Sequence, residues 1–377
     1  MRTGEFSKEQ LRQIDVKVSK FVKVTLNLVG PASAASNHYL YGASDADCLG
    51  LPCLEDELDG ILVDSAFKLL TSRDPHVRRI AWSNLADQIQ AWTASLDSRP
   101  DAKPAQVEAF LSDRGRSNLS FTWSAARNAS RRLAVFWSCP EWGFISATFQ
   151  EKTPQPADRR MLQRSIKTIM RSERALKLQK YPSQGIAMEC IPASKWGNQF
   201  IRTGENIRFC DWSFIHKACL NLCNLNALRL SSPEEEVDKS CRRCGHHTEN
   251  LPHVVSSCRP LFHLRTKQYD AVLDRLIKAR RRSFRILGRN HDVDGSGLRP
   301  DLVLVQGDTD ILIDVPDENR LTAFAYTRRD KATKYVHVTN NLQRTFSNVS
   351  NEAIIVGALG SWDRANDKVL RKFVNKG

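Results

Sequence analysis

Residues 299–335 read RPDLVLVQGDTDILIDVPDENRLTAFAYTRRDKATKY, and this stretch decides how the C-terminal part of the chain folds. The aliphatic runs Leu302–Val305 and Ile311–Ile313 are separated by Gly307-Asp308, a pattern that predicts two strands joined by a tight turn. The segment from Leu321 to Tyr335 contains neither Pro nor Gly and is long enough for about four helical turns. The stretch therefore predicts a strand–turn–strand–helix unit.

Acidic residues flank the two predicted strands, because Asp301 precedes the first and Asp314 closes the second. Carboxylates on neighbouring strands suit Mg²⁺, which prefers oxygen ligands and completes its shell with water and phosphate. Lys331 and Tyr335 are four residues apart and share one helical face, from which the lysine can offset charge that develops on a phosphate. The pattern indicates metal-dependent phosphodiester cleavage by Asp301, Asp314 and Lys331. The alternative is an exposed hairpin whose acids are merely solvated.

The bulk composition indicates a polyanionic partner. The chain has 377 residues, enough for two or three domains, and a net charge of +14, which favours nucleic acid or an acidic membrane surface. No apolar run approaches the roughly 18 residues of a membrane span, and the N-terminus lacks the apolar core of a signal peptide. We therefore expect an intracellular, reducing compartment, in which the 10 cysteines serve as metal ligands and buried thiols.

A second motif, CRRCGHHTENLPHVVSSC, has the spacing of a zinc site. Cys241, Cys244, His253 and Cys258 supply three thiolates and an imidazole, and Gly245 permits a turn after the second ligand. Four protein ligands predict a closed structural Zn²⁺ site rather than a catalytic one. His246 and His247 are alternative ligands. The competing interpretation of the whole motif is a cysteine-rich loop whose spacing matches that of a zinc site by coincidence.

Basic residues cluster in two segments. In residues 159–180 a single acid, Glu173, accompanies a row of cations that helical spacing places along one side: Arg160, Arg164, Lys167, Arg171 and Arg174. A second cluster ends a helix predicted from Tyr269 to Leu287 and lies just before the acids: Lys278, Arg280, Arg281, Arg282 and Arg285. Both clusters suit contacts to a nucleic-acid backbone, and the alternative for each is a solvated helix face.

The rest of the chain carries less chemistry. An amphipathic helix is predicted near the N-terminus, with Leu11, Ile14, Val18 and Phe21 on one face. Toward the C-terminus we expect a flexible loop from Gly288 to Gly297, a buried strand from Ala353 to Gly357 and a last helix from Asp367 to Val374. The chain has no Tyr/Phe-x-Asp-Asp motif, so a polymerase active site has no candidate residues.

The order of these motifs resembles that of one family. Its elements are the Cys-Cys-His-Cys knuckle, a basic helix, Arg299-Pro-Asp301, Asp314-Val315 with Glu318-Asn319, Asp330-Lys331-Ala-Thr-Lys334-Tyr335, and Ile354 to Gly360. Together they resemble the C-terminal half of the protein encoded by site-specific non-LTR retrotransposons of the restriction-like-endonuclease class. The likeness is best from Cys241 onward; the region from Leu11 to Trp82 is similar to a reverse-transcriptase thumb.

This resemblance implies an α+β protein in four parts: a helical thumb-like region (1–97), a helical basic linker (98–235), the zinc knuckle (236–265) and an α/β PD-(D/E)xK endonuclease domain (266–377). The domain would nick target DNA in the nucleus, so that the element's RNA, a further partner, is copied from the new 3′ end. Asp301 and Asp314 would hold Mg²⁺ and Lys331 would be the catalytic lysine, with Lys334, Tyr335 and Glu318 as further site residues.

The chain departs from the family pattern in two respects. The segment from Asp314 to Glu318 is one or two residues short, and the polymerase core is missing, which predicts a truncated copy, a fragment or a derived gene. The alternative function is therefore a catalytically inactive remnant that still binds nucleic acid. A third interpretation, a stand-alone repair or recombination nuclease, has no use for the thumb-like region.

Overall fold

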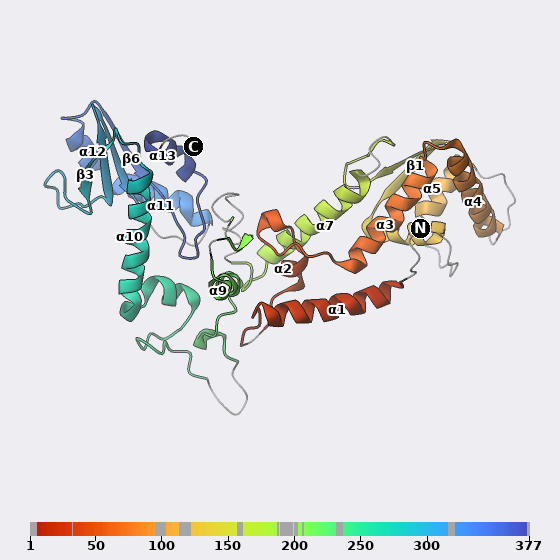
Figure 1. Ribbon diagram of the computed structural model, residues 1–377, viewed down its shortest axis with the longest axis horizontal. Helices are drawn as coiled ribbons and strands as arrows, with labels where there is room; N and C mark the ends of the chain where they lie inside the picture. The colour runs from red at the N-terminus through yellow and green to blue at the C-terminus, as the bar shows by residue number, and fades with distance from the viewer. Residues whose placement is uncertain are drawn as a thin grey trace. The chain divides into compact units, whose positions relative to one another are not determined.

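The computed structural model describes residues 6–31, 33–94, 103–112, 122–156, 161–186, 188, 199, 203–205, 207–230, 237–315 and 321–374. The chain divides into two compact units, the first made of Met1–Lys20, Tyr41–Ala43 and Gly50–Arg174, the second of Phe21–Leu40, Ser44–Leu49 and Ala175–Gly377. Each unit combines helices with a small sheet (Figure 1), so the predicted α+β class is confirmed. Within the described ranges, none of the helices has the length and apolar character that crossing a bilayer requires.

The first unit packs helices and a hairpin around one apolar cluster. Phe67, Leu85, Phe110 and Trp137 all belong to this cluster, and each is 5% exposed or less. The elements that contribute to the unit are α1 (Lys8–Thr25), α3 (Leu54–Leu70), α4 (Pro75–Ala94), α5 (Pro104–Ser112), α6 (Thr122–Leu133), β1 (Phe136–Glu141), β2 (Phe144–Thr148) and α7 (Met161–Gln179).

The β1–β2 hairpin corrects the prediction that residues 98–235 are helical. Its strands pair antiparallel, with Trp137 opposite Ala147, and both side chains are buried. Burial of alternate residues is the period of a strand that has one face on the core. Gly143 in the connecting turn has φ +94°, a conformation that costs glycine little. Pro140 within β1 conceals this strand from pattern analysis, because proline is unusual inside a sheet.

Helix α1 forms as predicted, but its apolar stripe does not define its buried side. Ile14, Val18 and Phe21 are exposed, whereas Asp15 is buried. The Asp15 carboxylate accepts hydrogen bonds from the backbone N–H groups of Leu54 and Glu55, both at 3.0 Å. These are the first N–H groups of α3, which have no partner within the helix. Asp15 therefore caps α3 from another helix, and this contact turns the polar side of α1 inward.

The second unit contains short helices, the knuckle and a mixed C-terminal sheet. Before the sheet lie α2 (Asn37–Tyr41), η1 (Ser44–Ala46), α9 (Phe209–Cys219), η4 (Asn226–Leu228), η5 (His253–Ser257), η6 (Arg259–Leu261) and α10 (Phe262–Ala279). The remaining elements are β3 (Arg285–Arg289), β4 (Leu302–Gln306), β5 (Thr309–Asp314), α11 (Leu321–Lys334), α12 (Val336–Leu342), β6 (Asn348–Ala353) and α13 (Asn366–Phe373). The sheet order is β3-β4-β5-β6, with β5 antiparallel to β4 and parallel to β6.

Both faces of the C-terminal sheet are covered, which explains why β4 and β5 are continuous aliphatic runs. Leu302, Leu304 and Ile313 pack in one cluster with side chains of α10 and α13. On the opposite face, Val303 and Leu312 pack against Tyr335 and two residues of α12. The predicted strand–turn–strand–helix unit is confirmed here, with Gly307 at φ +58° in the turn between β4 and β5.

The edges of this sheet are where the sequence prediction is wrong. Strand β3 occupies residues expected to end a helix, and β6 precedes the aliphatic run that was expected to be the strand. Strand β3 carries Arg285 and Arg289, and β6 carries Asn348, Asn351 and Glu352. Charged and polar side chains are common on edge strands, where they discourage pairing with other chains. The predicted flexible loop is also held in place, because the Asp292 carboxylate accepts hydrogen bonds from the N–H groups of Gly295 and Gly297 at 2.8 and 2.7 Å.

A buried carboxylate on β5 predicts a pH-dependent stability. Asp310 is 0% exposed, neither of its oxygens has a hydrogen-bond partner among the described residues, and burial raises its pKa to about 6. Because the folded state favours the protonated form, ionisation costs stability as pH rises from about 4 to about 6. We expect Asp310→Asn to gain about 1 to 3 kcal/mol at pH 7 relative to its effect at pH 4, measured by urea unfolding.

Asp308→Asn is the matched control for this prediction. Asp308 accepts a hydrogen bond from Ser347, which lowers the pKa of its carboxyl group, so its charged form stabilises the fold. Its substitution should lose stability at pH 7 and matter less as pH falls below the usual range of aspartate. The same pH trend in both variants would contradict the argument from burial.

Candidate active site and metal centre

The antiparallel pairing of β4 and β5 brings the two predicted acids to the same end of the sheet. Leu302 pairs with Ile313, so Asp301 just before β4 lies near Asp314 at the end of β5. Both acids line one cavity of about 330 Å³. The other residues that line it are Arg265, Gln268, Tyr269, Val272, Arg299, Val315, Lys331, Lys334, Tyr335 and Val356. The structure thus gathers Asp301, Asp314, Lys331, Lys334 and Tyr335 around one space.

Asp314 is buried at 4% exposure and is held by a cation and a hydroxyl. The Lys331 Nζ lies 2.7 Å from its Oδ2, and the Tyr335 hydroxyl lies 3.0 Å from its Oδ1. Lys331 and Tyr335 approach the acid together because they are one helical turn apart, as predicted. Burial and the Asp314 charge raise the pKa of Tyr335, so its hydroxyl stays neutral and able to donate at pH 7.

Asp301 lies in a different environment from Asp314. Its Oδ2 accepts a hydrogen bond from the N–H of Val315 at 2.5 Å, and Tyr269 lines the cavity beside it. Burial and then the charge of Asp314 raise the pKa of Asp301 to about 6, and the contacts from Tyr269 and Val315 offset part of this rise. The two carboxylates are therefore close enough to repel one another, and a cation between them would relieve that repulsion.

Of the other two predicted site residues, the structure describes Lys334 but not Glu318. Lys334 is exposed, with its ammonium 4.7 Å from the centre of the Tyr335 ring and 3.0 Å from that hydroxyl. It therefore contacts Tyr335 rather than a carboxylate. Glu318 lies outside the described residues.

Helix α10 contributes residues that the sequence analysis missed. Arg265, Gln268, Tyr269 and Val272 line the cavity at spacings of three and four, which is one face of a helix. The signal was present as a stripe of polar and aromatic residues, but no motif distinguishes it from a solvated face. Tyr269 also donates to the Asn290 Oδ1 at 3.1 Å, so the loop after β3 helps to place it.

The knuckle residues form the cluster that the spacing predicts. The ligand atoms of Cys241, Cys244, His253 and Cys258 all lie within 4.8 Å of one another. The sulfurs of Cys241 and Cys258 are 3.9 Å apart, close to the edge of a tetrahedron with Zn–S bonds of about 2.3 Å. Gly245 has φ +71° in the turn that follows the second ligand. The set could therefore hold a metal such as zinc.

The geometry of the cluster selects His253 rather than the alternative ligands. Burial raises the pKa of the Cys241 thiol, but hydrogen bonds from the backbone of Arg243 and Cys244 outweigh it and lower the pKa to about 7. A thiolate is the form that binds metal. The His246 ring stacks on the His253 ring, with centroids 4.4 Å apart, and neither His246 nor His247 belongs to the cluster.

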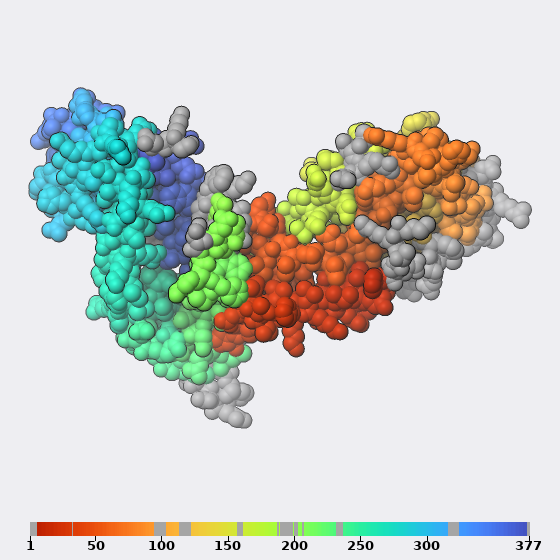
Figure 2. All heavy atoms as spheres, in the orientation of Figure 1, coloured from red at the N-terminus to blue at the C-terminus, as the bar shows by residue number. Residues whose placement is uncertain are grey.

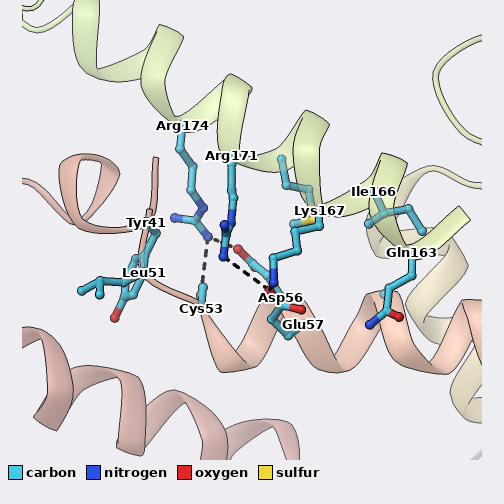
Figure 3. Close-up of a pocket in the computed structure, with 12 residues that line it drawn as sticks. Tyr41, Leu51, Cys53, Asp56, Glu57, Gln163, Ile166, Lys167, Arg171 and Arg174 are labelled. Atoms are coloured by element: carbon cyan, nitrogen blue, oxygen red, sulfur yellow. Dashed lines mark hydrogen bonds and ion pairs between the residues drawn. The ribbon is translucent and has the colours of Figure 1, made fainter. Parts of the chain in front are cut away.

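Three cations of α7 are paired with acids in the first unit. Figure 3 shows Lys167, Arg171 and Arg174 pointing from α7 toward Asp56 and Glu57 of α3. The Lys167 Nζ lies 2.7 Å from Glu57, Arg171 lies 3.7 Å from the same acid, and Arg174 pairs with Asp56. The prediction that these cations contact nucleic acid considered only the acids within residues 159–180. It did not include the acids of α3, which lie far away in the sequence. Arg164 is exposed, and Arg160 lies outside the described residues.

The second basic cluster is divided between structural and exposed side chains. Arg280 donates to the carbonyl of Ile277 at 2.7 Å, and Arg281 donates to the carbonyl of Arg371 at 2.9 Å. These two arginines hold the end of α10 and the end of α13 in place. Lys278, Arg282 and Arg285 are exposed and remain available to a ligand.

Comparison with known proteins supports a retroelement origin. No protein-family model matches the chain. Over 149 residues it is 32% identical to the Retrovirus-related Pol polyprotein from type-1 retrotransposable element R2 of Popillia japonica. The match covers 37% of this chain and 30% of that protein, so the chain spans less than a third of the relative's length. The chain is thus similar, over part of its length, to a retrotransposon polyprotein.

The knuckle geometry predicts one zinc ion per chain. Cys244→Ser removes a ligand and should weaken zinc affinity by more than the roughly 10- to 100-fold that loss of an outer-shell contact costs. Cys210→Ser is the control, because Cys210 is also an exposed thiol but lies outside the cluster. Zinc content after dialysis, measured by elemental analysis, should fall in the first variant and stay at one equivalent in the second. Equal zinc in both would contradict the assignment.

Proposed function

We propose that the C-terminal residues 266–377 form a divalent-metal-dependent endonuclease of the PD-(D/E)xK type, which cleaves DNA. The observation that carries this proposal is the pairing of Asp301 and Asp314 in one cavity, with the Lys331 ammonium 2.7 Å from Asp314. Two carboxylates and a lysine around a space of this size are what hydrolysis of a phosphodiester requires.

The donor set fits Mg²⁺, which prefers the hard oxygens of carboxylates. When bound, the ion would polarise a phosphate and lower the pKa of a coordinated water. Asp301 and Asp314 would supply the protein ligands. Tyr335 and the Val315 N–H would orient these carboxylates, and Lys331 would balance negative charge in the cavity. Lys334 would act through Tyr335, the residue that it contacts.

The proposed substrate follows from charge and relatedness. A net charge of +14 favours a polyanion, and the retrotransposon relative points to nucleic acid. We infer that the domain nicks target DNA in the nucleus, so that element RNA can be copied from the new 3′ end, with the knuckle and exposed cations holding nucleic acid. Arg164, Lys278, Arg282 and Arg285 are the predicted contacts whose side chains are exposed. The four-part domain division belongs to the same proposal.

One observation favours the second candidate, an inactive remnant that binds nucleic acid. Tyr335 donates to one oxygen of Asp314, the Lys331 ammonium forms an ion pair with the other, and one oxygen of Asp301 accepts from Val315. A metal would have to share or displace these contacts. The remnant would keep the zinc cluster and the exposed cations, neither of which depends on the carboxylates.

A plasmid-nicking assay separates the two candidates. With Mg²⁺, the parent protein should convert supercoiled DNA to the nicked form, and Asp301→Asn and Lys331→Ala should each reduce the rate about 100-fold or more. Asp308→Asn, an acid on the turn at the far end of β4, should keep the parental rate. DNA binding is followed in the same samples by gel shift. Binding without nicking by the parent would overturn the nuclease and support the remnant.

A further inference from the structure

Helix α10 joins the knuckle directly to the carboxylate cavity. Cys258, the last predicted zinc ligand, is separated from the start of α10 by the single turn η6. Four residues of the same helix, from Arg265 to Val272, line the cavity with Asp301 and Asp314. In Figure 1, α10 runs from the knuckle segment to the C-terminal sheet. The segment that carries two zinc ligands is therefore continuous with one wall of the proposed active site.

One side chain bridges these two places. The Arg265 guanidinium donates a hydrogen bond of 2.7 Å to the carbonyl of Ser256, which lies between the ligands His253 and Cys258. Arg265 also lines the carboxylate cavity and a groove of about 410 Å³ formed by residues 254–262. Its neighbours in the first turns of α10 are exposed, so few apolar contacts fix this part of the helix. The teal region that includes α10 lies at the surface in Figure 2. The position of the first turns of α10 therefore depends on polar contacts such as the one from Arg265 to the Ser256 carbonyl.

A second contact joins the knuckle to another segment that lines the cavity. Leu359 packs in the apolar cluster of Leu225, Leu251 and Val254, which surrounds the knuckle. Leu359 belongs to the turn that follows Val356, a residue that lines the cavity. The knuckle therefore contacts two of the segments that contribute to the cavity.

Metal binding would order the knuckle turn that Arg265 contacts. Residues His253–Ser257 form a single π-type turn, a conformation that is rare and seldom stable alone. When a ligand set of this kind binds metal, the binding free energy becomes folding free energy for the segment that carries the ligands. The Ser256 carbonyl lies within that segment, so its position depends on the same free energy.

We propose that Arg265 is a positioning residue through which metal at the knuckle fixes α10 against Asp301, and thereby sets the affinity of the carboxylate site for its own ion. The second half of this proposal rests on the proposed nuclease function; the first half does not. Tyr269, one turn after Arg265, lines the same cavity as Asp301, so the position of α10 sets the surroundings of that carboxylate. By linkage, each ion strengthens binding of the other by the same factor.

Hydrogen exchange on the full chain tests the first half. Removal of zinc by a chelator that spares Mg²⁺ should increase exchange of the backbone amides of residues 262–272 in the parent protein. In Arg265→Ala, these amides should exchange alike with and without zinc, and Arg265→Lys should restore part of the response because lysine can still donate. Lys267→Ala alters an exposed residue of the same helix that is not among those lining the cavity, and it should respond like the parent.

Calorimetric titration of Mg²⁺ tests the second half. Zinc removal should weaken Mg²⁺ binding about fivefold or more in the parent and in Lys267→Ala, but not in Arg265→Ala. Residues 262–272 that ignore zinc in the parent, or that still respond in Arg265→Ala, would overturn the proposal. Zinc-sensitive exchange with no Mg²⁺ binding in any form would support the positioning role and count against the nuclease.

Discussion

The C-terminal unit depends on the placement of two carboxylates side by side at the end of β4 and β5. Burying Asp314 next to Asp301 is unfavourable unless cations and hydrogen-bond donors compensate. Lys331 and Tyr335 supply that compensation to Asp314, and the backbone N–H of Val315 donates to Asp301. The fold is therefore built to keep a pair of acids together, an arrangement that costs stability and indicates a function.

Buried acids are also compensated in the first unit, but there they stabilise contacts between helices. Asp59 is buried and contacts the Lys8 ammonium at 2.6 Å and the Arg132 guanidinium at 2.6 Å, and Asp15 caps α3. The pairs between α7 and α3 similarly engage Asp56 and Glu57. Several cations of this unit are thus structural, so the row of basic residues along α7 offers a polyanion fewer free side chains than its sequence suggests.

The central strands and α11 could be predicted from sequence because burial imposes a clear pattern on them. Runs such as Leu302–Val305 are aliphatic since both faces of the sheet are covered, and the turn at Gly307 requires a special backbone conformation. The edge strands β3 and β6 carry charged or polar residues and half-buried positions, so their sequences resemble helix ends and loops. Hairpin β1–β2 was concealed by Pro140.

The candidate site also divides into residues that local spacing reveals and residues that only tertiary packing brings together. Asp301, Asp314, Lys331 and Tyr335 were identifiable because local spacing fixes their relation, and the zinc cluster was identifiable for the same reason. Tyr269 and Arg265 were not, since their roles arise from the tertiary packing of α10 against the sheet. The ion pairs of Arg171 and Arg174 were missed because their acids lie more than 100 residues earlier in the chain.

The most direct test of the central claim is a crystal structure of the protein soaked in Mn²⁺, with anomalous diffraction measured near the manganese edge. Manganese takes the same oxygen ligands as Mg²⁺ and can be located by its own signal. The account predicts a peak within about 2.5 Å of carboxylate oxygens from both Asp301 and Asp314. A fully ordered cavity with no peak, in which Lys331 still contacts Asp314, would contradict it.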